Sequence, residues 1–359
     1  RCASYRTFPL FHIIVPVIFS GMQLEDRKIL LACIGGTIIS YNVFRVLKAY
    51  YASVSSRSEW IPVGTVKNLW VHPIKSCKRK EVFSLYCDDL GARSGEIRDR
   101  EFLCIDEATG AMYSARQLPR LMLIDADVAD GALSVATPDG QTARVVLTEV
   151  IQRRIVRRAK IFGDPVDGLD CGDEVASVFS EFLETPGIRL IYYRPDLFNG
   201  RPCVTEPGWW NNPVPKRSDT VTYVDLSPFH VTTEESLQAL NQVLEEPISS
   251  TWFRANIVVD HSPAWDEDKW SEIKIGEVVL QCYKPCTRCI LTTVNPNDGV
   301  KSPEMQPMKT MREFRLAPEG PLRDVHGQFP IFGVNAGLLK PGFVHLGQTV
   351  YVKYKPSVF

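Results

Sequence analysis

Short β-type segments, separated by clusters of glycine, proline and aspartate, dominate the chain from about residue 62 onward. Val63–Val71 alternates apolar and polar residues as a strand does, and His72-Pro73 closes it. Further runs of this kind are Glu81–Cys87, Glu101–Ile105, Leu121–Asp127, Ala143–Leu147 and Gln152–Ile161. Short strands at this spacing are typical of a barrel or sandwich, whereas βαβ units would place a helix between strands. The pattern predicts a mainly β fold with some α.

A helix and a loop divide this β-rich region in two. Glu174–Phe182 gathers its apolar residues on one helical face, and Pro186-Gly187 terminates the helix. A loop rich in proline, arginine and tryptophan then leads to a second β-rich region. There Thr232-x-x-Glu235 fits a capping box, and apolar residues follow at helical spacing up to Leu244. We expect two β-barrel-like parts, residues 58–187 and 188–359, after an N-terminal region of residues 1–57.

The N-terminal region contains a candidate membrane anchor. Ile29–Phe44 is a run of 16 uncharged residues that lies between Arg27-Lys28 and Arg45. A bilayer core needs about 17 to 20 apolar residues, and the run approaches this length if Arg45 snorkels to the headgroups and Leu47 is included. Residues 29–47 are therefore predicted to form one membrane helix. The alternative is a buried core helix or an uncleaved signal segment. The sequence begins with Arg1 and not with methionine, which weakens a prediction of targeting.

Charge and missing motifs exclude several classes of function. The chain has 41 Lys and Arg against 42 Asp and Glu, a net charge of −1, whereas a nucleic-acid binder usually has a strong basic excess. Ten cysteines in 359 residues are too sparse for a disulfide scaffold, which indicates a reducing compartment. The dinucleotide, Walker, zinc-protease and serine-hydrolase signatures are absent from the sequence, and its six histidines have no metal-ligand spacing.

One motif can carry chemistry, the C-x-x-C formed by Cys286 and Cys289. By itself it fits half a zinc site, a dithiol pair, a loop that offers one thiolate to a soft metal, or two structural cysteines. A zinc site needs further ligands, and only Cys282 is near. A thioredoxin-type pair stands at the start of a helix, but Ile290–Val294 is β-branched and predicts a strand.

The longer string around this motif, Lys284-Pro-Cys-Thr-Arg-Cys-Ile-Leu-Thr-Thr-Val294, resembles the signature of MOSC-domain proteins, and more closely that of the amidoxime-reducing members of the family. The resemblance covers about residues 60 to 355. It includes, in the family's order, Val63–Val66, Pro73–Cys77, Arg93–Arg100, Ala115–Gln117, Asp170–Gly172, Asp225–Phe229 and Phe253–Val258.

The resemblance implies a molybdenum–pterin cofactor (Mo-molybdopterin) and assigns residues to it. The second cysteine, Cys289, becomes the protein ligand of molybdenum and the catalytic residue, which agrees with the preference of a soft metal for thiolate. The cofactor's phosphate requires cationic and polar donors. The resemblance assigns these roles to Lys75, Ser76, Arg100 and Arg254, with Ser227 and Asn256 in support. The sequence departs from the family at Leu226, where a hydroxyl residue is common.

The function implied by the resemblance is the reduction of N-hydroxylated compounds, such as amidoximes and hydroxylamines. Electrons are expected from cytochrome b5 and its NADH-dependent reductase, and the protein is expected in the outer mitochondrial membrane, facing the cytosol. The alternative is a carrier of sulfur or of the cofactor, related to the C-terminal part of molybdenum cofactor sulfurase. Arg153-Arg154 and Arg157-Arg158 form a basic patch that is either a dock for an acidic partner or a solvated strand face.

Overall fold

The computed structural model describes residues 23, 41–45, 59–201, 203–204 and 217–355. The chain divides into two compact units, Arg1–Glu59 and Trp60–Phe359. The predicted membrane helix of residues 29–47 lies outside the described residues except for residues 41–45, which are helical. None of the helices within the described ranges has the length and apolar character needed to cross a membrane.

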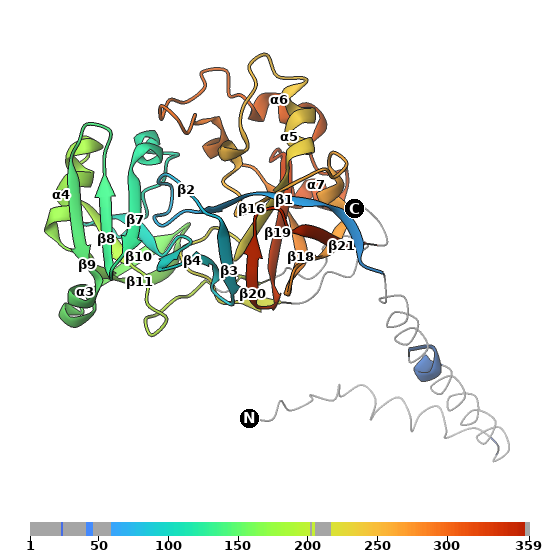
Figure 1. The fold of residues 1–359 in the computed structure, drawn as a ribbon, viewed down its shortest axis with the longest axis horizontal. Coiled ribbons are helices and arrows are strands. Elements are labelled where there is room, and N and C mark those ends of the chain that lie inside the picture. Colours follow the sequence, from blue (N-terminus) through green and yellow to red (C-terminus); the bar gives the residue numbers. More distant parts are fainter. Residues whose placement is uncertain (1–22, 24–40, 46–58, 202, 205–216, 356–359) are drawn as a thin grey trace. The chain divides into compact units, whose positions relative to one another are not determined.

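Seven strands of the second unit form a closed ring, with β1 (Ile61–Val71) as the strand that completes it (Figure 1). Around the ring the order is β1-β16-β15-β19-β18-β17-β21 and back to β1, and the short strand β2 extends from β1. The bounds of these other strands are β2 Lys80–Glu81, β15 Phe229–Thr233, β16 Ile257–Asp260, β17 Trp270–Ile275, β18 Val278–Thr287, β19 Ile331–Lys340 and β21 Thr349–Tyr354.

Strand β1 closes the ring because both of its edges are paired. It is antiparallel to β21 on one side and to β16 on the other, with a register shift in each pairing. Gly64 lies at the closest approach, because a Cβ on this residue would stand 1.8 Å from the carbonyl oxygen of Asp260 in β16. Only a residue without a side chain allows the two strands to come this close.

Residues 84–192 form smaller sheets beside the ring. A three-stranded sheet, β7-β8-β9, lies with helices α3 and α4 at one end of the unit (Figure 1). A four-stranded sheet, β10-β11-β12-β6, is bridged at its edges through Ala111–Lys160 and Met112–Ile105. Another sheet, β20-β3-β4-β5, takes its first strand from the end of the chain. The bounds are β3 Ser84–Asp88, β4 Gly91–Ser94, β5 Ile97–Arg98, β6 Phe102–Asp106, β7 Asp125–Ala129, β8 Ala132–Ala136, β9 Thr142–Val146, β10 Val156–Ile161, β11 Asp164–Asp170, β12 Ile188–Tyr192 and β20 Gly342–His345.

The expectation of a mainly β protein is confirmed, and a barrel is confirmed for the ring. In the sheets, however, strands of the two expected parts are mixed. Strand β1 belongs to the ring together with strands from beyond residue 228, whereas β20 pairs with β3. A small pair, β13 Cys203–Val204 and β14 Ser218–Asp219, flanks the undescribed residues 205–216.

The helices are short, and several sequence-based expectations about helical segments are wrong. The bounds are α3 Leu147–Arg153, α4 Asp173–Phe182, α5 Glu234–Asn241, α6 Met308–Phe314 and α7 Pro321–His326, with 3₁₀ turns η1 Pro119–Leu123, η2 Ser250–Phe253, η3 Asp266–Lys269 and η4 Ile290–Thr293. The strand expected over Leu121–Asp127 begins only at Asp125, because its first residues belong to a 3₁₀ turn. Helix α3 takes the start of the strand expected over Gln152–Ile161, because Leu147 and Val150 bury one face of a helical turn. Helix α5 is capped by Thr233, which accepts from the Ser236 amide, and not by the Thr232–Glu235 pair.

Two large apolar clusters stabilise the unit. The inside of the ring is filled by fully buried side chains such as Trp270, Leu69 and Phe229. The second cluster packs α4 against the smaller sheets around Phe102 and Phe179. Each such side chain contributes on the order of 1.5–3 kcal/mol by burial. These two cores fix the loops between the strands, and the site residues predicted from the sequence lie in those loops.

Replacing Gly64 tests the closure of the ring. We expect Gly64→Ala to lower the free energy of unfolding by about 1–3 kcal/mol, because the new methyl group forces β1 away from the Asp260 carbonyl. Urea unfolding measures this loss. Ser134→Ala on the exposed face of β8 is the control and should change stability by less than about 0.5 kcal/mol. Equal stabilities of the two variants would contradict the role of Gly64.

Candidate functional site

One cavity collects all seven residues that the sequence assigns to the cofactor. Its lining includes Lys75, Ser76, Arg100, Ser227, Arg254, Asn256 and Cys289. They come from segments far apart in the chain: the turn after β1, the turn between β5 and β6, the segment before β15, the segment between η2 and β16, and the loop between β18 and η4. Four of these segments adjoin strands of the ring, and the turn between β5 and β6 comes from the smaller sheets beside it.

The cavity carries a large excess of positive charge. Among the described residues that line it, one is acidic, Asp225, and five are basic: Lys75, Arg100, Arg116, Arg254 and Arg288. Burial of like charges without counter-charges is costly. A cavity of this composition favours an anionic ligand.

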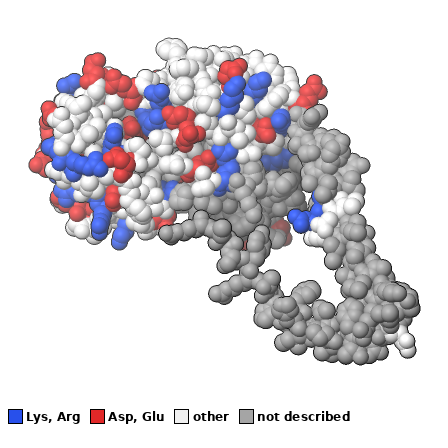
Figure 2. All heavy atoms as spheres, turned by 90° about the horizontal axis from the view of Figure 1, so that it is seen from below, with Lys and Arg blue, Asp and Glu red and all other residues white. Residues whose placement is uncertain are grey.

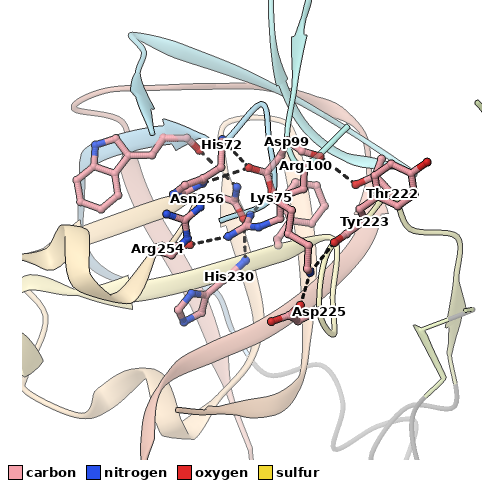
Figure 3. A network of polar contacts seen from close by, with 12 residues as sticks. His72, Lys75, Asp99, Arg100, Thr222, Tyr223, Asp225, His230, Arg254 and Asn256 are labelled. Atoms are coloured by element: carbon pink, nitrogen blue, oxygen red, sulfur yellow. Dashed lines mark hydrogen bonds and ion pairs between the residues drawn. The ribbon is translucent and has the colours of Figure 1, made fainter. Parts of the chain in front are cut away.

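Lys75 and Asp225 form an ion pair at the cavity wall (Figure 3). The Lys75 ammonium also donates to the Tyr223 carbonyl at 2.6 Å. Burial lowers the pKa of Lys75 to about 8, although Asp225 acts in the opposite direction. Desolvation would raise the pKa of Asp225, but the Lys75 charge overcomes it and lowers that pKa to about 2. At neutral pH both groups are ionised, and the pKa of Lys75 lies closer to neutral pH than that of Asp225.

Arg100 is positioned by a buried carboxylate outside the cavity lining. Asp99 pairs with the Arg100 guanidinium, and it also accepts from the His72 amide at 2.8 Å and from His72 Nδ1 at 3.3 Å (Figure 3). Burial, together with the charges of Arg254 and Arg100, lowers the pKa of His72 to about 3. The imidazole is therefore neutral, and the Asp99 charge is available to Arg100.

Arg254 is a buried cation whose charge is poorly compensated. Its Nη2 is buried and has no hydrogen-bond partner among the described residues. Burial and the neighbouring charge of Arg100 lower the pKa of Arg254 to about 9. The carbonyl of Arg254 accepts from Arg100 Nη2 at 3.1 Å, which ties the two arginines together. An anion in the cavity would satisfy the open donor and restore the pKa.

Three of the lining residues have left-handed backbones although they are not glycine. The φ angles are 70° for Ser76, 50° for Arg100 and 54° for Arg254. Such a conformation costs about 1–3 kcal/mol per residue and is concentrated at functional sites. Each of the three residues lies in a turn that faces the cavity, so the strain is associated with the placement of these side chains.

Asn256 and Ser227 use their side chains to support the wall. Asn256 accepts from the His230 amide at 3.1 Å and donates to the Trp70 carbonyl at 3.4 Å, so it joins β15 to β1. The single Ser227 hydroxyl hydrogen is shared between the Phe229 carbonyl at 2.7 Å and Asn335 Oδ1 at 2.9 Å. Both residues line the cavity, but their polar atoms already have protein partners.

The cysteine loop differs from its sequence-based expectation. Residues Ile290–Thr293 form the 3₁₀ turn η4 and not a strand. The Thr292 and Thr293 hydroxyls donate to the carbonyls of Cys289 and Ile290 at 2.9 and 2.8 Å. These back-bonds let β-branched residues form a turn. Cys289 immediately precedes η4 and is partly exposed.

Cys286 is the more constrained of the two cysteines. Its sulfur accepts from Arg288 Nη1 at 2.8 Å, and Arg288 Nη2 donates to the Phe253 carbonyl at 2.8 Å. Cys286 is buried, although it also lines the cavity. No group of three His, Cys, Asp or Glu residues with metal-binding geometry occurs in the part of the chain that the structure describes.

Two of the four arginines of the basic patch, Arg154 and Arg157, form ion pairs. Arg157 binds Asp170 at 2.6 Å and Glu107 at 3.1 Å, and Arg154 binds Asp196 at 2.9 Å. On the face shown in Figure 2, basic and acidic side chains are interspersed. These pairings favour the interpretation of residues 153–158 as a solvated surface.

Two family models match the chain in tandem. The MOSC N-terminal beta barrel domain matches residues 63–186, and the MOSC domain matches residues 218–351. The chain is a MOSC-domain protein. The mitochondrial amidoxime-reducing component 1 of Mus musculus is 37% identical over 290 residues, which cover 81% of this chain and 82% of that protein. The human components 1 and 2 are 35% and 36% identical, with 81% and 80% of this chain covered and 83% of each relative.

Sequence reasoning overlooked several residues of this MOSC cavity. Arg116 lies within a motif quoted for the resemblance, and Arg288 lies between the two cysteines, so both had a local signal but no assigned role. Asn335 lines the cavity from β19 and has no such signal. Leu226, the departure from the family pattern, is 39% exposed and forms part of the lining.

Replacing Asp99 tests how the cavity's positive charge is held. Asp99→Ala leaves Arg100 and the His72 amide without their buried acceptor, so we expect a loss of about 3–5 kcal/mol in the free energy of unfolding. Asp127→Ala is the control, since this exposed carboxylate on β7 only approaches Lys80 at 3.5 Å. Urea unfolding compares the variants. Similar losses in both would contradict the account.

Proposed function

We propose that this MOSC-domain protein is a molybdenum-cofactor-dependent reductase of N-hydroxylated compounds, such as amidoximes and hydroxylamines. One observation carries the proposal. The seven residues that the sequence assigns to the cofactor, drawn from five separate segments, line a single cavity with one carboxylate against five cations. The homology to amidoxime-reducing components supports the same reaction.

The donor set fits the group that the family implies. A pterin cofactor ends in a phosphate, and the open Nη2 of Arg254 offers that phosphate a buried donor. Arg100, held by Asp99, and Lys75 supply further positive charge from the same wall. Ser76 lies beside Lys75 in a strained turn. Lys75, Ser76, Arg100 and Arg254 would therefore hold the phosphate end, and Ser227 and Asn256 would fix the wall behind it.

Cys289 would supply the thiolate that a soft metal prefers. When bound, the cofactor supplies two-electron redox chemistry at the substrate oxygen. An amidoxime takes up two electrons and two protons and yields an amidine and water. The residues of the chain bind and orient the cofactor and the substrate. Asp225 stays ionised at neutral pH, and burial lowers the pKa of His230 below its usual range, so neither side chain changes its protonation state near neutral pH. Burial lowers the pKa of Lys75 to about 8, so this side chain is positively charged at neutral pH and can attract the anionic end of the cofactor.

The proposal also covers the electron donor and the cellular location of the protein. We infer, from the homology, a cytochrome b5 and its NADH-dependent reductase as electron donors. We also propose that residues 29–47 anchor the protein in the outer mitochondrial membrane with the body facing the cytosol. The names of the relatives, which are mitochondrial proteins, support this location.

Replacing the two cysteines separately tests the proposed metal ligand. We expect Cys289→Ala to abolish benzamidoxime reduction and to leave the melting temperature close to the parent's, because the Cys289 side chain does not cap η4. Cys286→Ala should keep most activity. Molybdenum analysis, an activity assay and thermal unfolding on the same samples separate the outcomes. Activity of Cys289→Ala equal to the parent's would refute the assignment, and stoichiometric molybdenum without turnover in the parent would favour a carrier.

Replacing the cations tests the phosphate site. Lys75→Ala, Arg100→Ala and Arg254→Ala should each lower cofactor occupancy, since losing a charge-assisted hydrogen bond costs about 1.5–3 kcal/mol, or roughly one to two decades in affinity. Lys67→Ala is the control, because Lys67 lies on β1 and pairs with Glu234 at 3.2 Å outside the cavity. Molybdenum and pterin content of purified protein is the measurement. Full occupancy in all three variants would show that these cations do not hold the cofactor.

A further inference from the structure

A phenylalanine stands at the tip of the β10–β11 hairpin, where the backbone does not favour it. Ile161 pairs with Asp164, so Phe162 and Gly163 form a two-residue turn. Their φ angles are 52° and 98°. Hairpin turns with two positive φ angles prefer Asn-Gly or Asp-Gly, because other side chains are strained at the first position. The ring is also 52% exposed, so neither the turn nor burial explains it.

Phe162 is not itself a lining residue of the cavity, but its ring contacts two residues that are. The Arg116 guanidinium carbon lies 4.6 Å from the ring centroid, and Lys75 Nζ lies 5.9 Å from it. Both residues line the cavity. Cations at such distances are attracted to the face of an aromatic ring. The hairpin tip therefore lies beside the cavity, although its strands belong to another sheet.

A third cation, Arg201, also contacts the Phe162 ring. The Arg201 guanidinium carbon lies 5.9 Å from the ring centroid. Its Nη1 and Nη2 donate to the carbonyls of Val224 and Asp225, both at 2.9 Å. Those two residues also line the cavity. The ring is thus tied to two walls of the site.

The Arg116 guanidinium is available to a ligand. Among the residues that the structure describes, it forms no hydrogen bond or ion pair, and its recorded partner is the Phe162 ring. Asp225, whose pKa it helps to lower, is already bound to Lys75. A half-exposed phenylalanine beside a planar cation that has no hydrogen-bond partner among the described residues is a surface on which a flat aromatic group can pack.

We propose that Phe162, supported by Arg116, is a specificity-determining residue that packs against the aromatic group of N-hydroxylated aryl substrates at the mouth of the cavity. The inference rests on the proposed function and adds a substrate preference to it. Aromatic substrates gain a contact here that small N-hydroxylated substrates cannot make. The preference therefore shows in substrate binding and leaves the redox chemistry unchanged.

The test uses the loaded parent protein and the variants Phe162→Ala, Phe162→Leu and Phe162→Trp, with benzamidoxime and hydroxylamine as probes. Calorimetry on oxidised protein without an electron donor gives the Kd of benzamidoxime, and steady-state assays give KM for both probes. Phe162→Ala and Phe162→Leu should raise the Kd and KM of benzamidoxime roughly 2- to 12-fold. Their KM for hydroxylamine should stay within about twofold, and Phe162→Trp should behave as the parent.

Phe83→Ala is the matched control: Phe83 is 86% exposed, and among the described residues no cation of the cavity lining lies over its ring, in contrast to Phe162. It should change neither substrate. Unchanged benzamidoxime binding in Phe162→Ala would overturn the inference. An equal rise in KM for both probes, or a loss of molybdenum, would also overturn it, because the ring would then act through Lys75 and Arg116. A loaded parent that reduces neither probe would refute the proposed function itself.

Discussion

The pairing of β1 with β16 is the contact on which the site depends. It closes the seven-stranded ring, and it joins the first described strand to a strand almost 200 residues later. The turn after β1 carries Lys75 and Ser76, and the segment before β16 carries Arg254 and Asn256. Asn256 bonds across this seam to the Trp70 carbonyl, and the Trp70 amide donates to the Asn256 carbonyl at 2.9 Å. A ring opened at this seam would separate the two halves of the cavity.

A second constraint is the management of buried positive charge. Lys75 is held by Asp225 and Arg100 by Asp99, whereas Arg254 keeps an open donor. Burial lowers the pKa of Lys75 to about 8 and that of Arg254 to about 9. An anion that raises these two pKa values binds more tightly as the pH falls, because both side chains are then fully protonated and positively charged. A cavity with these charges favours a negative ligand, such as the phosphate of the proposed cofactor.

Much of the fold could be predicted from the sequence because its signals are local. Alternation from Val63 to Val71 indicated β1, and one-sided apolar spacing indicated α4. The turn η4 could not be recognised, because its β-branched residues favour strands and only hydroxyl back-bonds to Cys289 and Ile290 reverse that preference. The ring's closure was also hidden, since strand order depends on contacts between distant segments.

The candidate site could be predicted only in part, for a related reason. The seven assigned residues came from motifs of a recognised family, and the structure brings them to one cavity. Their left-handed backbones at Ser76, Arg100 and Arg254 have no signature in the residue types, because tertiary contacts offset the strain. Likewise, the place of Phe162 beside the cavity follows from the packing of one sheet against another and not from its neighbours in the chain.

The central claim is that Cys289 binds the metal of a molybdenum cofactor within this cavity. X-ray absorption at the molybdenum edge, on the parent protein and on Cys289→Ser and Cys286→Ser variants, tests it most directly. The account predicts molybdenum in a sulfur-rich environment, with one sulfur ligand fewer in Cys289→Ser and no change in Cys286→Ser. Absence of molybdenum from the parent, or loss of the sulfur ligand in Cys286→Ser instead, would contradict it.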